Sequence, residues 1–482
     1  MKRGRDAHAT NTHALNRTMP RANPVKIILM SLLGIGSVLL LAFGPRADDQ
    51  FPKGRVIVDY WEKWTGSEEA GMRDVVEQFN ATVGAEKKIF VRYLSTSGVV
   101  DKTLIATAGG VPPDIAGLYN QNIPQFAAMQ ALEPLDQLAM SRGITPDTYK
   151  KVYWDECCFG GRLYGLVSTA YDIALYYNTD IFQQRAEQLR ARGLDPNRAP
   201  RTIAELDAYA QALDQRDDKG RLIVAGYIPL EPGWYQNYTC IWFGGSWWDA
   251  KANSFDFLNP GVVRAYKWIQ SYSKRLGSGA ETEFRSGFGS FDSPQNAFLS
   301  GTVAMVQQGT FLANFIRKQK PSMAGKWAAA PFPSENPTLK DVTYCNCDVM
   351  VIPRGAEHKS EAFEFIAYVN RQAVMEELAK SHCKISPLAQ VSEDFLNNHT
   401  NPYIRVFDSL AASPNAHATE PVPILPEVDA EMNNFVQKLA LLQTTPEDGL
   451  EAMQTRLQAK YEGFVADQRE RRERQQGEAA GR

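Results

Sequence analysis

RVIVDYWEKWTGSEEAGMRDVVEQFNATVGAEKKIFVRYLSTSGVVDKTLIATAGGVPPDIAGLY, residues 55–119, is the stretch that decides the fold. It contains three short β-rich runs, at 55–61, 89–94 and 114–119, and the segments between them have helical character. This alternation is typical of a parallel sheet with right-handed crossover connections. Ligands of such sheets bind at the carboxyl ends of the strands, so the residues that follow each run are candidates for a binding site.

The first helix of this stretch shows how the residues specify the elements. Ser67 can cap its amino terminus, and Glu68 and Glu69 in the first turn complement the helix dipole. Apolar residues then recur on one face, at Met72, Val75, Val76 and Phe79. Further strands are expected at 163–167, 173–178, 301–306 and 349–353, and further helices from Thr202, at 262–276 and at 360–380. The sequence therefore predicts an α/β protein.

Length and charge narrow the class of protein. The 482 residues exceed one ordinary core but suit two lobes with tails. The net charge of -3 gives no reason to expect a nucleic-acid partner, because such proteins concentrate basic charge on one face. H-E-x-x-H, G-x-S-x-G, Walker and C-x-x-C motifs are all missing from the sequence. We therefore expect a non-enzymatic protein with no catalytic residues, no metal and no cofactor.

The amino terminus has two parts, a basic segment at 1–26 and an uncharged, mostly apolar run at 27–43. This order is typical of a signal peptide or a signal anchor. The residues around Pro45 lack the small side chains of a good cleavage site, and no Cys follows the run for lipid attachment. We therefore favour an uncleaved anchor at 27–44 in the cytoplasmic membrane over a removed signal. Either way, the body from about Asp48 is expected on the periplasmic or cell-surface side.

Six cysteines in an exported chain favour structural disulfides over reactive thiols, and the sequence does not choose among the possible pairings. Their spacing also lacks the paired C-x₂-C pattern of a zinc site. The six are Cys157, Cys158, Cys240, Cys345, Cys347 and Cys383.

Six blocks of sequence occur in a familiar order: AGGVPPDI at 108–115, LEPLD at 132–136, GRLYGL at 161–166, LYYNTDIF at 175–182, GTVAM at 301–305 and EAFEFI at 361–366. Together they resemble the extracellular solute-binding proteins of the maltose and sugar-binding family, family 1, that serve ABC importers. The resemblance runs from about residue 55 to 465. Val167 and Ile203 depart from it, since the family usually has Pro and Trp there, and the cysteines and the uncleaved anchor are unusual.

This resemblance implies a two-lobed periplasmic-binding-protein fold with a hinge of crossing segments and an interlobe ligand cleft. The crossings are expected near Ser168–Asp172, after Pro333 and near Ile385–Pro387. The lobes are expected at 54–168 with 340–385 and at 172–332 with 388–465. Residues 466–482 are charged and have little to bury, so we expect a disordered tail or a frayed helix end there.

The resemblance also implies what the protein binds and with what it works. The expected ligand is a small polar solute, a mono- or oligosaccharide, that hinge closure captures by reversible binding. The closed form would be recognised by ABC transporter permease subunits, and we expect a monomer.

A sugar site needs aromatic rings for the C–H face of the ligand and polar groups for its hydroxyls. Of the four aromatic residues selected in the stretch 234–248, we expect two to line the cleft and two to pack internally. The candidate ligand-binding residues follow the predicted strands, lie on the crossings or belong to this stretch. They are Trp61, Glu62, Trp64, Ser97, Asn120, Tyr171, Asp172, Trp234, Tyr235, Trp247, Trp248, Gln308, Thr310 and Asn346.

Three alternatives stay open. A glycosidase would need two carboxylates across a cleft, a geometry that the sequence does not show. A membrane-tethered sensor of the same fold would present its closed form to a signalling partner instead of a permease. A polyol or a glycerol phosphate could replace the sugar, although no basic cluster near the candidates favours phosphate.

Overall fold

The computed structural model describes residues 51–480. The predicted basic segment at 1–26 and the predicted anchor at 27–44 lie outside the described residues. Within the described part, no helix combines the length and the apolar character needed to cross a membrane.

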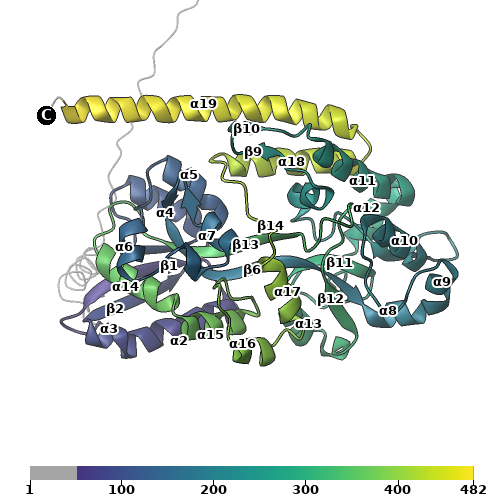
Figure 1. Ribbon diagram of the computed structural model, residues 1–482, viewed down its shortest axis with the longest axis horizontal. Helices are drawn as coiled ribbons and strands as arrows, with labels where there is room; N and C mark the ends of the chain where they lie inside the picture. Colours follow the sequence, from purple (N-terminus) through teal and green to yellow (C-terminus); the bar gives the residue numbers. More distant parts are fainter. Residues whose placement is uncertain (1–50, 481–482) are drawn as a thin grey trace, which may run out of the picture. The chain divides into compact units, whose positions relative to one another are not determined.

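One ten-stranded sheet runs through the described chain, in the order β2-β1-β3-β13-β6-β11-β8-β7, with β12 paired to β6 and β14 to β13 (Figure 1). The parallel pairs β1–β2 and β1–β3 confirm the arrangement predicted for residues 55–119. The strands are β1 Val56–Glu62, β2 Ile89–Ser95, β3 Ile115–Tyr119, β6 Gly165–Asn178, β7 Gln215–Arg216, β8 Leu222–Tyr227, β11 Val303–Gly309, β12 Trp327–Ala330, β13 Thr343–Val351 and β14 Ala416–His417. Two short hairpins lie apart from it, β4 Cys158–Phe159 with β5 Arg162–Leu163, and β9 Trp248–Asp249 with β10 Ser254–Phe255.

Strand β6 joins the two halves of this sheet. The predicted strands at 163–167 and 173–178 are largely merged into this one strand of 14 residues. Its first part, through Asp172, pairs with β13, and its second part, from Ile173, pairs with β11 and β12. Nearly all of its residues are buried. The first predicted crossing, Ser168–Asp172, therefore lies on a strand that both halves of the sheet share.

The first lobe consists of β1–β3 and the helices packed around them. Helix α2 buries Met72, Val75, Val76 and Phe79, as their spacing predicts. The prediction of a single helix at 360–380 is wrong, because the chain forms two helices that are interrupted at Asn370. The Asn370 side chain accepts and donates hydrogen bonds of its own, and it donates one to the Ile366 carbonyl at 2.9 Å. The first-lobe helices are α2 Gly66–Ala81, α3 Val83–Glu86, α4 Val99–Ala108, α5 Ile123–Ala128, α6 Asp136–Ser141, α7 Lys151–Glu156, α14 Lys359–Val369 and α15 Gln372–His382.

The second lobe consists of β7, β8, β11 and β12 with their helices. Helix α10 begins after Thr202, whose side chain accepts a bond from the Glu205 amide at 3.1 Å, as the sequence predicts. Helices α16 Glu393–Asn397 and α17 Ile404–Ala411 follow α15, and α17 packs against β6 and β13. The second-lobe helices are α8 Thr179–Gln184, α9 Ala186–Ala191, α10 Ile203–Leu213, α11 Pro260–Leu276, α12 Ser278–Ser286, α13 Leu312–Gln319, α18 Leu425–Ala440 and α19 Pro446–Ala480.

Helix α19 is the longest helix of the described chain, with 35 residues, and it runs along one side of both lobes (Figure 1). Of the two alternatives predicted for the tail at 466–482, the helix end rather than the disordered segment matches the structure as far as Ala480, and residues 481–482 are outside the description. Good helix formers fill this segment, and Glu470 and Arg474 form an i,i+4 ion pair at 3.2 Å. These local preferences keep the segment helical although it has little to bury.

The apolar core has two clusters, one centred on each lobe. The first also includes Leu312, Trp327 and Phe407, because α17 joins the crossing strands to the neighbouring part of the second lobe. The exact lobe limits given above stay predictions.

The predicted disulfides are wrong, because all six cysteines are free thiols in the structure. Five of them are buried and Cys158 is half-buried. Cys345 and Cys347 lie on the fully buried strand β13, and Cys240 lies in the second core cluster. Buried thiols of this kind pack as small apolar side chains.

Candidate ligand-binding site

A cleft of about 660 Å³ opens between the lobes. The chain that follows β1 and β3 forms its first-lobe wall, and residues 233–238 with helix α18 form the opposite wall. Strands β6 and β13 contribute the residues at its base. The carboxyl ends of the parallel strands β1 and β3 thus face the cleft, as expected for a sheet of this topology.

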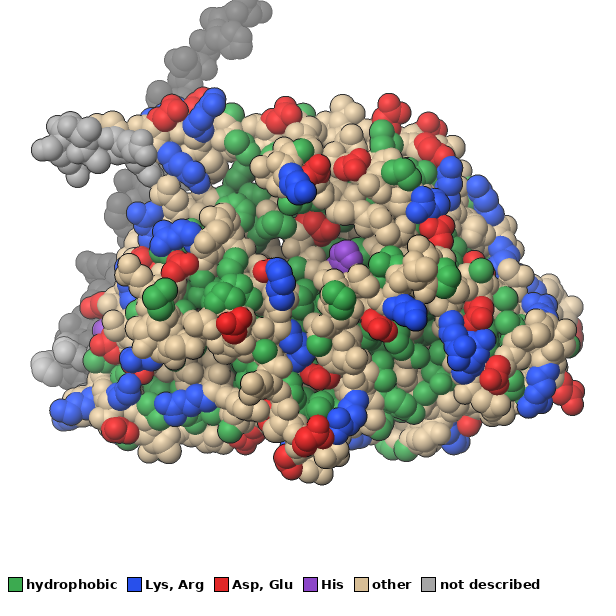
Figure 2. Space-filling model, in the orientation of Figure 1, with side chains coloured by type: hydrophobic (Ala, Val, Ile, Leu, Met, Phe, Trp, Pro, Cys, Tyr) green, Lys and Arg blue, Asp and Glu red, His purple; other side chains and the backbone are tan. Residues whose placement is uncertain are grey.

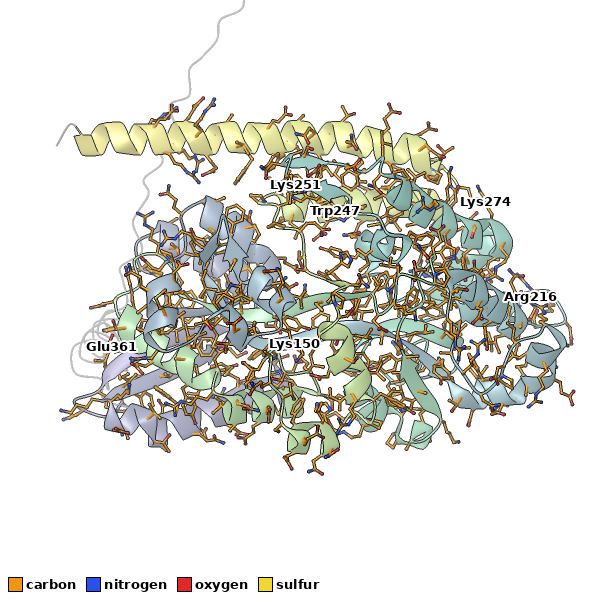
Figure 3. All side chains as sticks on the ribbon, viewed as in Figure 1. Lys150, Arg216, Trp247, Lys251, Lys274 and Glu361 are labelled. Atoms are coloured by element: carbon orange, nitrogen blue, oxygen red, sulfur yellow. The ribbon has the colours of Figure 1, made fainter. Side chains whose placement is uncertain are left out.

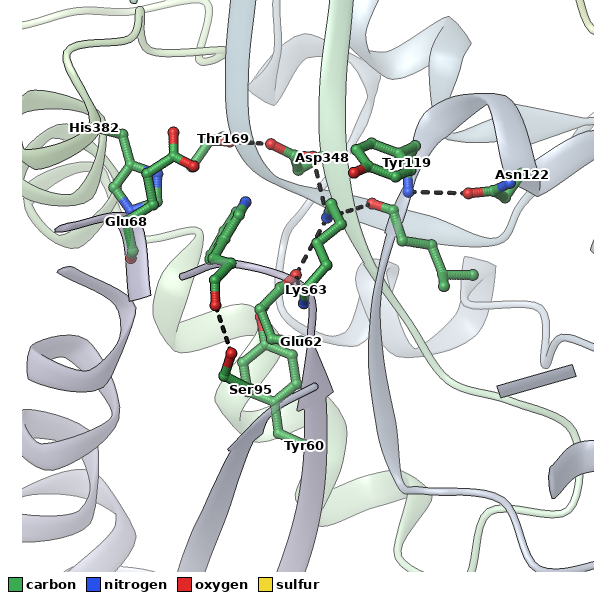
Figure 4. A network of polar contacts seen from close by, with 12 residues as sticks. Tyr60, Glu62, Lys63, Glu68, Ser95, Tyr119, Asn122, Thr169, Asp348 and His382 are labelled. Carbon is green, nitrogen blue, oxygen red and sulfur yellow. Dashed lines mark hydrogen bonds and ion pairs between the residues drawn. The ribbon is translucent and has the colours of Figure 1, made fainter. Parts of the chain in front are cut away.

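Lys63 leaves the end of β1 and lies at the centre of a buried ionic network (Figure 4). Its ammonium nitrogen is 3.1 Å from a carboxylate oxygen of Asp348 and 3.2 Å from one of Glu62. It also donates to the Leu118 carbonyl at 3.2 Å. Burial by itself would lower the pKa of Lys63, but the Asp348 and Glu62 carboxylates raise it above its ordinary value. The cation is therefore permanent and fully engaged.

Asp348, on β13, holds a second cation in the same network. Lys384 approaches one of its oxygens at 3.0 Å, and Thr169 donates to that oxygen at 2.7 Å. Burial favours the protonated carboxyl, yet Lys384 and Lys63 hold the pKa of Asp348 well below its usual range. Lys384 also lies 3.7 Å from Glu68, at the start of α2. Each buried ammonium group thus has two carboxylate partners.

His382 lies behind this network and stays neutral. Burial, together with the nearby Lys384 ammonium, lowers the pKa of His382 to about 3. One ring nitrogen is 2.9 Å from the Glu68 carbonyl oxygen, and the ring packs edge-on against Trp64 with centroids 4.8 Å apart (Figure 4). The imidazole therefore supports the Trp64 indole without adding charge.

Aromatic rings line the cleft from both lobes. The first lobe contributes Trp64 and Tyr119, and the Lys63 ammonium lies 4.5 Å from the Tyr119 ring centroid. Tyr171 of β6 packs edge-on against Phe311 at 5.1 Å. These rings form one wall and part of the base.

The second-lobe wall is also aromatic. Trp234 is 48% exposed and packs edge-on against Phe291 at 4.7 Å, so its indole is supported and still accessible. Tyr238 stacks on Tyr344 of β13 with centroids 3.9 Å apart and planes inclined by 14°. The stack connects the second-lobe wall to a crossing strand.

Polar groups lie between the second-lobe rings. Asn237 donates to the Asp429 carboxylate of α18 at 2.8 Å, and Gln236 donates to the Asn433 amide oxygen at 3.2 Å. Burial raises the pKa of Asp429 to about 6, although the bond from Asn237 opposes this rise. This wall offers amide and carboxyl groups but no cation among the described lining residues.

The structure brings together five of the fourteen candidate residues at this cleft. They are Trp64, Tyr171, Trp234, Tyr235 and Asn346.

The structure does not bring the remaining strand-end candidates to the cleft surface. Glu62 is fully buried beneath Lys63 and accepts a bond from Tyr60 at 2.6 Å. Trp61 packs against the first core cluster, and Ser97 lies exposed in the turn before α4. Asn120 is buried and donates to Thr419 at 2.9 Å. These side chains act behind or beside the cleft.

The candidate residues on β6 and at the end of β11 also lie away from the cleft surface, for a different reason. Side chains alternate across a strand, so Asp172 points away from the face that Tyr171 presents to the cleft. Burial and then the nearby Asp408 carboxylate raise the pKa of Asp172. Gln308 and Thr310 are also buried, and Gln308 accepts a bond from Tyr235 at 3.2 Å. Gln308 therefore supports a cleft residue instead of lining the cleft.

Trp247 and Trp248 are buried and do not line the cleft. Figure 3 shows Trp247 in the part of the molecule beneath α19. Trp247 stacks on Phe257 at 5.6 Å, and Trp248 packs edge-on against Tyr461 of α19 at 5.2 Å. The prediction that two of the four aromatic residues line the cleft and two pack internally thus agrees with their positions. The preceding Gly245 is needed because a Cβ there would lie 2.6 Å from the Val262 amide nitrogen.

Lys63, Asp348 and Lys384 were missed by the sequence reasoning. Lys63 had a usable signal, since it stands between Glu62 and Trp64 at the end of the first strand. Asp348 and Lys384 had no such signal in the sequence, because only folding brings them next to Lys63.

Comparison with known proteins agrees with this geometry. Residues 74–398 match the family of bacterial extracellular solute-binding proteins. The chain belongs to this family. Membership of an extracellular solute-binding family implies an extracytoplasmic location for the solute-binding protein.

Solved structures of similar fold include CpMnBP1 with mannobiose bound, at 24% identity and a TM-score of 0.71, covering 83% of this chain and 99% of that one. The sugar-binding protein MalE from Xanthomonas citri has 20% identity and a TM-score of 0.68, covering 87% of this chain and 99% of its own. These likenesses confirm the predicted two-lobed α/β fold of the solute-binding protein.

Curated relatives match a smaller part of this chain than the solved structures do. A binding protein from Brucella abortus is 22% identical over 275 residues, which are 56% of this chain and 61% of that protein. The solute-binding protein thus spans about 61% of the length of this relative. The sn-glycerol-3-phosphate-binding periplasmic protein UgpB of Shigella flexneri is 23% identical over 333 residues, 56% of this chain and 72% of UgpB.

Proposed function

We propose that this protein is the extracytoplasmic substrate-binding component of an ABC importer and that it captures an uncharged carbohydrate in the interlobe cleft. The observation that carries the proposal is the pair of aromatic walls, one on each lobe, with hydrogen-bonding groups between them. The cleft volume of about 660 Å³ is within the range of roughly 300–1,000 Å³ of small-molecule sites.

Aromatic rings suit the C–H faces of a sugar ring. By analogy with nucleobase stacking, each ring contact contributes about 1–3 kcal/mol. Trp234 and Tyr119 are the most accessible of these rings, with 48% and 41% of their surface exposed. They lie on opposite lobes, so one ligand could contact both when the cleft closes.

The ionic network favours a neutral ligand over a phosphate. Lys63 and Lys384 are the cations that line the cleft, and both are engaged with carboxylates. An anion would have to break these pairs and would face Asp429 on the opposite wall. The relationship to UgpB keeps glycerol phosphate as the alternative ligand, but the charge of this cleft does not favour it.

Closure of the cleft would bend β6, the strand that both halves of the sheet share. A ligand that contacts both walls stabilises the closed form and shifts the population toward it. The closed form is then the state that permease subunits recognise. We further propose a monomer tethered to the cytoplasmic membrane by residues 27–43.

We propose binding without catalysis. Lys63 and Asp348 are held to each other and to further charged groups, so neither is poised to transfer a proton to a ligand. A membrane-tethered sensor remains the second candidate, because the predicted anchor suits it equally. Cells that lack the cognate permease distinguish the two functions. In those cells a transport component no longer affects uptake of the ligand, whereas a sensor still affects gene expression.

The test is calorimetric titration of the purified protein with mannobiose, maltose and sn-glycerol 3-phosphate. Saturable binding of a neutral saccharide that leaves the saccharide intact supports the proposal. Binding of glycerol phosphate alone, or release of shortened sugars, would overturn it.

A further inference from the structure

A second cavity, of about 650 Å³, lies away from the cleft, between the first lobe and the carboxyl-terminal half of α19. Its first-lobe wall comes from the segments around Gln130–Pro134, Arg162–Tyr164 and Arg354–Lys359, and α19 contributes Arg472. Figure 2 shows basic side chains gathered on this part of the face, beneath the helix. The cavity is almost as large as the cleft.

Helix α19 reaches this cavity because its other half is fixed to the second lobe. Leu450, Met453 and Leu457 are completely buried in the second core cluster. Arg456 and Lys460 lie 2.8 and 3.3 Å from the Glu431 carboxylate of α18. Arg472, about three turns farther on, is therefore held above the first lobe by a rigid helix.

The cavity is basic. Arg162, Arg354, Lys359 and Arg472 line it, whereas Glu133 is the one carboxylate among the described lining residues. Lys359 lies 2.7 Å from Glu133, and Arg162 lies 3.4 Å from Asp136 beside the cavity.

Two of the guanidinium groups have no such partner. Among the side chains that the structure describes, neither Arg354 nor Arg472 has a carboxylate within ion-pair distance. Arg354 is nonetheless oriented, since it donates to the side-chain oxygen of Gln130 at 2.9 Å. An oriented guanidinium group without a counter-charge matches the paired oxygens of a phosphate or sulfate group.

We propose that this cavity is a binding site for a phosphate or sulfate group, separate from the ligand cleft, with Arg354 and Arg472 as its principal contacts. An oxyanion there would bridge the first lobe to α19 and satisfy both guanidinium groups. The group could be a free anion or part of an acidic lipid headgroup, and the chemistry of the site is the same for both.

Calorimetric titration of the full chain with inorganic phosphate, at an ionic strength held constant with sodium chloride, tests the site. We expect saturable binding that the double variant Arg354→Gln/Arg472→Gln weakens at least about tenfold. Arg474→Gln is the matched control: it removes the same charge from the same helix, but Arg474 is paired with Glu470 and does not line the cavity. It should bind phosphate as the wild type does.

A second control separates this site from the cleft. Trp234→Ala should leave phosphate binding unchanged, because Trp234 lines only the cleft side of the molecule. Vesicles with and without phosphatidylglycerol, compared between the double variant and Arg474→Gln, tell whether a lipid headgroup is a source of the anion. No saturable phosphate binding, or equal binding by the double variant and the wild type, would overturn the proposal.

Discussion

The two cavities have nearly the same volume, about 660 and 650 Å³, but opposite chemistry. In the cleft, Lys63 and Lys384 are buried and share Asp348, and aromatic rings from both lobes line the cleft around them. Beneath α19, the cations are exposed, two guanidinium groups have no carboxylate partner in the described chain, and Tyr164 is the only aromatic residue among the described lining residues.

The comparison teaches that the number of cations does not decide which ligand a cavity selects. A buried cation needs a counter-charge, because the cost of desolvation is otherwise too large. A buried cation that is paired in this way helps to order the cleft, but it provides little attraction for an anionic ligand. An exposed cation stays solvated without a partner and is available to a ligand. The following predictions test this contrast, beginning with the largest effect.

Removing the shared carboxylate should destroy the charge balance of the cleft. Asp348→Ala leaves two buried ammonium groups with fewer partners, and we expect a loss of about 3–5 kcal/mol in the free energy of unfolding, measured with urea. Asp394→Asn is the control, since Asp394 forms an exposed pair with Lys380 at 3.5 Å and should cost at most about 1 kcal/mol. Equal losses in both variants would contradict the role of Asp348. If Asp348→Ala remains folded, it should also gain phosphate binding in the cleft.

Acid should act on the neutral histidine behind the cleft. The folded pKa of His382 is about 3, well below the value of about 6.5 in an unfolded chain. Between these values the unfolded state binds a proton that the folded state excludes, so this contribution to stability is present above about pH 6.5 and is lost as the pH falls. From pH 6.5 to 5 the loss should be about 2 kcal/mol.

The variant His382→Gln isolates this effect, because glutamine can still donate to the Glu68 carbonyl but does not titrate. Buried acids act in the opposite direction: burial raises the pKa of Glu156 to about 8, so its contribution to stability grows as the pH falls from that value. The difference between wild type and variant, measured by urea unfolding at several pH values, cancels this background. Identical pH dependence in the two proteins would rule out His382 as the source.

Shortening the most accessible ring should weaken saccharide binding with little effect on stability. For Trp234→Ala we expect a loss of about 1–3 kcal/mol in binding free energy, roughly fivefold to 150-fold in Kd, measured by calorimetry with a saccharide that binds the wild type. Leu258→Ala, which trims another exposed apolar side chain outside the cleft, should bind normally. Unchanged affinity in Trp234→Ala would remove this ring from the site.

The smallest effect is expected beneath α19. Glu133→Gln removes the carboxylate that lies 2.7 Å from Lys359 and should strengthen phosphate binding by about 1 kcal/mol, roughly fivefold. Glu361→Gln removes the same charge from α14 outside the cavity and should have no such effect. A weaker affinity in Glu133→Gln would show that the carboxylate orients the cations instead of competing with the anion.

Some of the site could be predicted from the sequence and some could not. Trp64, Trp234 and Tyr235 were accessible to prediction, because aromatic residues at strand ends and in a loop-like stretch are recognisable locally. Asp172 was misplaced by the alternation of side chains along a strand, where one position changes the face. Gln308 was misplaced because it lies behind the cleft residue Tyr235, to which it is hydrogen-bonded. The exact register of β6 and β11 was needed to tell which side chains of these strands face the cleft.

The sequence by itself determined the strand and helix order of residues 55–119, because periodicity and turn residues act over a few positions. The solute-binding family and the two-lobed α/β fold followed from the resemblance of six sequence blocks to that family. Only the tertiary structure decided that Lys63, Asp348 and Lys384 meet at one point and that α19 carries Arg472 over the first lobe. Electrostatic pairing depends on distances between segments that are separate in the sequence, and no local pattern encodes those distances.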